Sequence, residues 1–182
     1  MKTPVLFIVI PCYNEQEALP ITAKRLTELT DDMLARGIID PESCIVLVDD
    51  GSRDATWQVI SDLHAADGRF EGVKLAHNAG HMNALWAGMT LSAERCDCVI
   101  TIDADLQDDV NAMYGFLEEY RNGADVGPAC APAGRRIPSS SAQRPRVSTN
   151  SLTGWAWRWS TTTRTTDCCR SARSRRSCPS AR

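Results

Sequence analysis

The stretch Cys98-Val-Ile-Thr-Ile-Asp-Ala-Asp-Leu-Gln-Asp108 is an apolar run that leads directly into carboxylates. It predicts a buried β-strand over Val99 to Ile102, followed by Asp103 and Asp105. Side chains alternate between the two faces of an extended chain, so these two carboxylates can converge on one ligand. Two convergent carboxylates suit a hard divalent cation, Mg²⁺ or Mn²⁺, that also contacts phosphate oxygens, whereas the alternative is a solvated acidic loop.

Three similar apolar runs precede this stretch, and each of the four is followed by a helical pattern. Strands are predicted at residues 5–10, 45–48, 73–76 and 99–102, with a fifth beginning at 124–126. Asn14 and Glu17 form a predicted capping box for a first helix that Gly37 ends, and Asp54 is the predicted N-cap of the second. Regular alternation of strands and helices predicts an α/β fold with right-handed crossovers and a parallel sheet.

Polar clusters follow each of the four predicted strands. They lie at residues 11–15, 49–52, 78–81 and 103–105. In a parallel sheet, ligands bind at the carboxyl ends of the strands. The four clusters are therefore expected to meet at one edge of the sheet and to form one site.

These clusters, in this order and spacing, resemble family-2 inverting glycosyltransferases, in particular the polyprenyl-phosphate sugar transferases of the bactoprenol glucosyl and dolichol-phosphate mannosyl type. The resemblance covers residues 4–126. It implies a GT-A fold that binds a UDP- or GDP-sugar with Mg²⁺ or Mn²⁺ at the Asp-x-Asp. It also implies a lipid-phosphate acceptor and, in the intact family, association with the cytoplasmic face of a membrane.

The resemblance further implies roles for individual side chains. It places Pro11, Tyr13 and Glu15 around the base and ribose, and gives Asp50, with Asp49, an acceptor role toward the uracil imide or the ribose. It places Asn78 in the nucleotide-sugar site, Asp103 near ribose and metal, and Asp105 at the metal facing the diphosphate, which makes Asp103 and Asp105 the catalytic pair. His81 is interpreted either as a hydrogen-bonding residue at a helix start or as a ligand contact.

Length and composition limit the alternatives. At 182 residues the chain is long enough for one domain with a tail. It contains no apolar run of about 18 residues and no signal-peptide pattern, so we expect no membrane span and a cytoplasmic protein with reduced cysteines. The eight cysteines lack metal-site spacing, which predicts neither a zinc site nor a disulfide framework.

The charge of the chain divides near residue 126. Residues 1–126 contain 9 Lys plus Arg and 22 Asp plus Glu, whereas residues 127–182 contain 11 Arg and one acid. The first part is predicted to be the nucleotide-sugar-binding part of a GT-A domain. The second, rich in Arg, Ser and Thr, has too little apolar surface for a core, which predicts a largely disordered tail.

Two other functions compete with sugar transfer at this stage. Arg170 to Arg176 and the tryptophans at 155–159 could form a nucleic-acid-binding module. A nucleotidyltransferase of similar fold is the other alternative.

A shift of reading frame is our preferred hypothesis for the tail. Residues 155–166, recoded one base back, can read Met-Gly-Val-Glu-Val-Val-Tyr-Asn-His-Ala-Asp-Tyr, which is similar to the family at this place. Under this hypothesis the chain lacks acceptor-side residues, and we expect weak donor binding and little transfer. The DNA sequence across codons 124–130 would test it, and an intact frame relative to close relatives would contradict it.

Overall fold

The computed structural model describes residues 3–106, 109–124, 126–128 and 155–158. Strands and helices alternate along the first 121 residues. The strands are β1 (Leu6–Cys12), β2 (Cys44–Asp49), β3 (Phe70–Lys74), β4 (Cys98–Thr101), β5 (Val126–Pro128) and β6 (Trp155–Arg158). The helices are α1 (Leu19–Ala35), α2 (Thr56–Ala66), α3 (His81–Ser92) and α4 (Ala112–Arg121).

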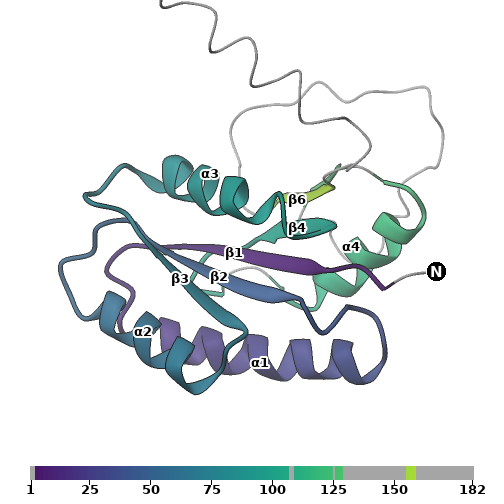
Figure 1. Cartoon of the computed structure of the whole chain (residues 1–182), viewed down its shortest axis with the longest axis horizontal. Helices are drawn as coiled ribbons and strands as arrows, with labels where there is room; N and C mark the ends of the chain where they lie inside the picture. Colours follow the sequence, from purple (N-terminus) through teal and green to yellow (C-terminus); the bar gives the residue numbers. More distant parts are fainter. Residues whose placement is uncertain (1–2, 107–108, 125, 129–154, 159–182) are drawn as a thin grey trace, which may run out of the picture.

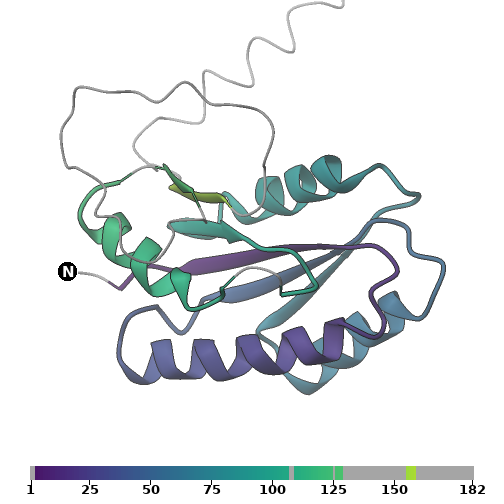
Figure 2. The same ribbon diagram turned by 180° about the vertical axis from the view of Figure 1, so that it is seen from behind.

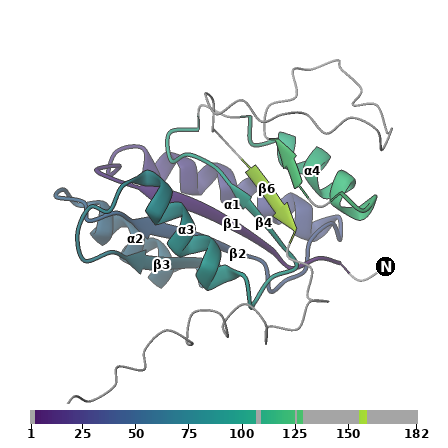
Figure 3. The same cartoon turned by 90° about the horizontal axis from the view of Figure 1, so that it is seen from above.

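The strands form one sheet in the order β3-β2-β1-β4-β6-β5 (Figure 3). β1 pairs in parallel with both β2 and β4, and β2 pairs in parallel with β3. The chain therefore builds the sheet outward from β1, first through β2 and β3 on one side and then through β4 on the other. The predicted parallel α/β sheet is confirmed, and β1 and β4 flank the position at which the direction of winding reverses, where such sheets bind ligands.

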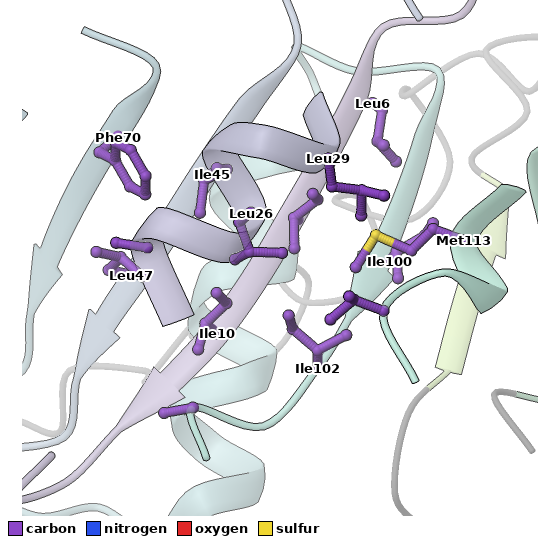
Figure 4. Packing of buried hydrophobic residues seen from close by; sticks show 14 of the residues in the cluster. Leu6, Ile10, Leu26, Leu29, Ile45, Leu47, Phe70, Ile100, Ile102 and Met113 are labelled. Carbon is purple, nitrogen blue, oxygen red and sulfur yellow. The ribbon is translucent and has the colours of Figure 1, made fainter. Parts of the chain in front are cut away.

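Helices cover both faces of the sheet, with α1 and α2 on one face and α3 on the other (Figure 1). The larger core lies between the sheet and the two helices α1 and α2. There Leu26 and Leu29 of α1 pack over Ile10 and Ile100 of the strands (Figure 4). α4 adds Met113 and Leu117 to this core and lies beside the carboxyl end of α1 (Figure 2). Strands covered on both faces are apolar at every position, which explains the continuous hydrophobic runs of β1 and β2.

The ends of α1 differ in how well the sequence predicted them. Gly37, at φ +62°, ends the helix as predicted, and its N–H and that of Ile38 donate to the Leu34 and Met33 carbonyls. The capping box at Asn14 is wrong, because α1 begins at Leu19 and its N-cap position, Ala18, makes no side-chain cap. Asn14 instead adopts φ +57° and bonds to another loop.

β3 begins three residues earlier than predicted, at Phe70 rather than Val73. It is an edge strand in which Phe70 enters the larger core while Gly72 and Lys74 are exposed. An edge strand carries polar residues at its exposed positions, so residues 70–72 did not form an apolar run and the start of the strand was not recognised. The prediction of Asp54 as the N-cap of α2 is wrong by one residue, because the N-cap position is Ala55, which makes no side-chain cap. The Asp54 carboxylate nevertheless accepts the N–H of Thr56, the first residue of α2, at 3.0 Å.

The tail predicted to be disordered falls mostly outside the described residues. Two short stretches within or next to it are described, and both are strands. β6 pairs antiparallel with β4 and with β5, so residues 155–158 extend the sheet beyond β4. None of the helices in the described ranges combines the length and the apolar character needed to cross a membrane.

Candidate nucleotide-sugar site

A cavity of about 300 Å³ lies at the carboxyl edge of the sheet. Its walls come from the end of β1 and from the loops that follow β1, β2, β3 and β4. The lining residues are Pro11, Cys12, Tyr13, Glu15, Asp50, Asn78, Gly80, His81, Asp103, Ala104 and Asp105. The predicted convergence of four polar clusters at one edge is therefore confirmed.

Hydrogen bonds join the loop after β1 to the loop after β2. The Asn14 N–H donates to Ser52 Oγ at 3.0 Å, and the Arg53 N–H donates back to Asn14 Oδ1 at 2.9 Å. The Glu15 N–H donates to Thr56 Oγ1 at 2.8 Å. These bonds use backbone groups, which leaves the Tyr13 ring and the Glu15 carboxylate at the cavity. The three bonds join the two loops into one wall of the cavity, and a wall held in place before binding lowers the entropy cost of ordering a ligand.

Asp49 and Asp50, although adjacent, have different surroundings. Asp49 is fully buried, its Oδ1 accepts the Ser52 N–H at 3.0 Å, and its Oδ2 has no hydrogen-bond partner among the described residues. It does not line the cavity, so the structure does not bring Asp49 to the predicted nucleotide site. The reason is that Asp49 is still the last residue of β2 and its side chain closes the turn that follows.

Asp50 lines the cavity and also holds the loop that follows β3. Its two carboxylate oxygens accept the N–H groups of Ala79 and Gly80, at 2.7 and 2.9 Å. Gly80 has φ +93° and directly precedes α3. Asp50 thereby fixes the start of α3, with Asn78 and His81, against the cavity. This link was not predictable from the sequence pattern, in which its one signal was a glycine immediately before a predicted helix.

Asp103 and Asp105 reach the cavity through the predicted alternation, although β4 itself ends at Thr101. Ile102 and Ala104 are buried and continue the larger core, so the two aspartates between and after them face away from it. Asp103 Oδ1 lies 3.8 Å from His81 Nε2 of α3. The two carboxylates and this imidazole thus share one wall of the cavity.

The residues present fit a divalent cation that is held jointly with a ligand. Within the described ranges no group of three or more His, Cys, Asp or Glu side chains is placed to hold a metal by itself. Mg²⁺ and related ions are commonly bound by one or two carboxylates with phosphate oxygens completing the shell. Asp103 and Asp105 supply two carboxylates at the cavity, and a diphosphate would supply the rest.

Negative charge gathers at this cavity and affects Glu15. Burial raises the pKa of the Glu15 carboxyl above its ordinary value, and the carboxylates of Asp105, Asp54 and Asp103 raise it further. Each of these neighbours disfavours the ionised form by like-charge repulsion. A bound cation would reduce this repulsion, which is a second reason for placing one here.

Glu15→Gln should stabilise the ligand-free protein at neutral pH. A carboxyl with a raised pKa in the folded state favours folding fully below its ordinary value of 4.5, and this contribution is lost as pH rises through the folded-state pKa. The variant should therefore exceed wild type in free energy of unfolding at pH 7.5, by less than about 1 kcal/mol because solvent screens a half-exposed group. At pH 4 the difference should disappear.

Urea denaturation at both pH values measures this effect. Glu17→Gln, two residues along and exposed, is the matched control and should show no such difference. A Glu15→Gln protein less stable than wild type at pH 7.5 would contradict the electrostatic picture of the cavity.

The structure brings together every predicted site residue except Asp49, and it adds Cys12, Gly80 and Ala104 to the walls. Cys12 is buried at the end of β1, and burial raises the pKa of its thiol far above the ordinary range, so it is an unreactive wall. All three fall within the predicted polar clusters, but no feature of their own singled them out as residues that line the cavity.

Comparison with known proteins identifies the wider group. The model of the glycosyl transferase family 2 matches residues 7–175. A relative named glycosyltransferase YkoT, from Bacillus subtilis, is 45% identical over 123 residues, which are 68% of this chain and 36% of that protein. The bactoprenol glucosyl transferase of Shigella phage SfX is 35% identical over 120 residues, 65% of this chain and 36% of its own length. The chain thus spans about a third of the length of these relatives.

Solved structures give a weaker likeness. Glucosyl-3-phosphoglycerate synthase from Mycobacterium tuberculosis, in complex with Mn²⁺, UDP and glucosyl-3-phosphoglycerate, is 22% identical, with a TM-score of 0.47. The match covers 68% of this chain and 42% of that one.

Proposed function

This chain belongs to glycosyltransferase family 2, and from that premise we propose that it binds a nucleoside-diphosphate sugar for inverting transfer to a polyprenyl phosphate or a related lipid phosphate. The observation that carries the proposal is the single cavity on which Tyr13, Asp50, Asn78, Asp103 and Asp105 converge from four loops. The acceptor class is taken from the bactoprenol glucosyl transferase among its relatives. The chain spans about a third of the length of such proteins. The activity of the whole enzyme is therefore proposed as well, together with donor binding.

The nucleoside would lie against the wall formed by the loops after β1 and β2. Tyr13 is 41% exposed and offers a ring face for the base, with Pro11 and Glu15 beside it. Asp50 can accept the imide hydrogen of a pyrimidine, since each carboxylate oxygen has two lone pairs and only one is used by the loop after β3. Asn78 would contact the ribose or phosphate from the opposite wall.

The diphosphate would lie at the Asp103 and Asp105 wall. These two residues would hold Mg²⁺ or Mn²⁺, which supplies charge neutralisation for the departing diphosphate. Asp103 would also accept a hydrogen bond from the ribose, with His81 Nε2 lying 3.8 Å from its Oδ1. The chain's own contribution is therefore to orient the donor and to gather negative charge where a cation is required.

Sugar transfer needs little proton transfer from the protein. An oxygen of the lipid phosphate attacks the anomeric carbon from the side opposite the diphosphate, and the bond from that carbon to the diphosphate oxygen breaks with its electron pair. A phosphate monoester is largely ionised near neutral pH, so a general base is not required. Positioning of donor and acceptor then determines the rate.

The two alternative functions have less support. Family membership favours sugar transfer over nucleotidyl transfer. The Arg-rich segment needed for nucleic-acid binding lies outside the described residues. The division of the chain into residues 1–126 and a tail remains a proposal, as does the frameshift. We also propose a cytoplasmic location, supported by four buried cysteines that are free thiols.

Calorimetry of the full chain with UDP or GDP, with and without Mn²⁺ or Mg²⁺, tests the proposal. We expect one of the two nucleotides to bind, and to bind at least about 10-fold more tightly with the metal, because the cation completes its shell with phosphate oxygens. Absence of binding under all four conditions would contradict the proposal. Release of sugar rather than pyrophosphate from the matching nucleotide sugar would then separate sugar transfer from nucleotidyl transfer.

A further inference from the structure

A hydroxyl on α1 contacts the loop that carries the two aspartates. Thr22 is 2% exposed, and its Oγ1 donates to the Ala104 carbonyl oxygen at 2.5 Å, across 82 residues of sequence. The same oxygen lies 3.2 Å from the carbonyl oxygen of Ala18, the N-cap residue of α1. A hydroxyl has one hydrogen, so the shorter contact with Ala104 receives it. This is a direct hydrogen bond between the first helix and the segment between Asp103 and Asp105.

Ala104 lies between the two aspartates of the cavity, so a bond to its carbonyl acts on the segment that carries them. Ala104 is 4% exposed and packs into the larger core, while Asp103 and Asp105 on either side line the cavity. Leu106, directly after Asp105, adopts the left-handed backbone region at φ +54°. β4 ends at Thr101, and the Ile102 N–H still donates to the Val9 carbonyl of β1 at 3.2 Å. A hydrogen bond that holds the Ala104 carbonyl toward α1 therefore restrains the peptide that joins Ala104 to Asp105, and through Ala104 it restrains the neighbouring Asp103.

We propose that Thr22 is a positioning residue for the metal-binding pair Asp103 and Asp105, acting through the Ala104 carbonyl. The inference rests on the proposed function, because it concerns the cation and diphosphate held at that wall. Thr22 itself lies outside the cavity and does not contact the nucleotide. Groups that orient metal ligands typically change metal affinity by about 10- to 100-fold when removed, and we expect Thr22 to fall in this range.

The simpler explanation is that Thr22 only satisfies a buried carbonyl and supports the fold. The two explanations differ in what a serine should do. Thr22→Ser keeps the hydroxyl and loses a buried methyl group, so it should lower stability and leave metal-dependent binding intact. Thr22→Val keeps the shape and loses the hydroxyl, so it should lower metal-dependent binding more than stability accounts for.

α1 offers a matched control in Thr27. Its hydroxyl donates to the Ala23 carbonyl at 2.9 Å, one turn back within the same helix. Thr27→Val makes the same chemical change in the same element without touching the aspartate loop. Thr22→Ala provides a second variant without the hydroxyl, in case valine prevents folding.

Binding of UDP with and without Mn²⁺ is measured by calorimetry, and Mn²⁺ binding by electron paramagnetic resonance, for wild type and all four variants. We expect Thr22→Val and Thr22→Ala to lose about 10- to 100-fold in Mn²⁺-supported affinity, with Thr22→Ser and Thr27→Val within about 3-fold of wild type. Equal affinities of folded Thr22→Val and Thr27→Val would overturn the positioning role while leaving the proposed function standing. A wild-type chain that binds neither nucleotide nor Mn²⁺ would overturn both.

Discussion

Asp105→Asn is expected to abolish the metal-dependent part of nucleotide binding, lowering affinity in the presence of Mn²⁺ by more than about 100-fold. The loss should exceed that caused by a supporting partner, because the substitution removes a ligand itself and replaces an anionic oxygen by a neutral amide oxygen. Binding without metal should change much less, because the contacts proposed for the nucleoside, with Tyr13, Glu15 and Asp50, do not involve Asp105. Calorimetry with UDP or GDP, with and without Mn²⁺, measures both quantities.

A second consequence distinguishes a lost ligand from a damaged fold. After burial, Asp105 is the largest contributor to the raised pKa of Glu15. Without its charge the pKa of Glu15 should fall toward the ordinary value, so Asp105→Asn should leave the ligand-free protein at least as stable as wild type at pH 7.5. Weaker binding together with unchanged or higher stability is the expected signature.

Asp62→Asn is the matched control, because Asp62 is exposed on α2 and bonds only to Gln58 of the same helix among the described contacts. It makes the same chemical change away from the cavity and should bind nucleotide like wild type. Wild-type affinity of Asp105→Asn in Mn²⁺ would contradict the assignment of the metal to this wall.

The sequence was sufficient to predict the parts of the site that depend on regular structure. β1 is apolar throughout, and β2 and β4 are apolar up to their last residues, Asp49 and Thr101, because both faces are covered; such runs are readily recognised. Once four parallel strands are in place, their carboxyl ends must meet at one edge. Asp50, Asn78, Asp103 and Asp105 were therefore predictable as neighbours before any contact was known.

The sequence was insufficient wherever tertiary contacts compete with local preferences. Asn14 and Glu17 satisfy the pattern of a capping box, yet Asn14 bonds to Arg53 and Ser52 of another loop instead. Asp49 and Asp50 are chemically identical neighbours, and only the position at which β2 ends determines which of them reaches the cavity. Thr22 contacts Ala104 across the core, and nothing local to either residue indicates the pairing.

Gly51→Ala is expected to produce the largest loss of stability of any substitution near the site. Gly51 has φ +67°, and a Cβ at this position would lie 2.5 Å from the Asn78 backbone nitrogen and 2.6 Å from the His77 carbonyl carbon. Both contacts are with backbone, so one of the two loops must move. Strain at positive φ and overpacking each cost about 1–3 kcal/mol, for a combined loss of roughly 2–6 kcal/mol in free energy of unfolding.

Two other glycines serve to separate the cost of strain at positive φ from the cost of overpacking. Gly37 has a similar φ of +62° but would place its Cβ in open space, so Gly37→Ala should cost only the conformational strain, about 1 kcal/mol. Gly115 lies within α4, has no positive φ and also has open space, so Gly115→Ala should stabilise the protein by up to about 1 kcal/mol. Urea denaturation of the three variants should therefore give a clear order.

The movement forced by Gly51→Ala should also reach the nucleotide site. His77 and Asn78 directly precede Ala79 and Gly80, whose N–H groups bond to Asp50. Displacing these residues pulls the start of α3 away from the cavity, so the fraction of Gly51→Ala that remains folded should bind nucleotide more weakly than Gly37→Ala of equal folded fraction. Equal affinities would show that the close approach of these two loops supports the fold alone, and that Asp50 can hold its place without it.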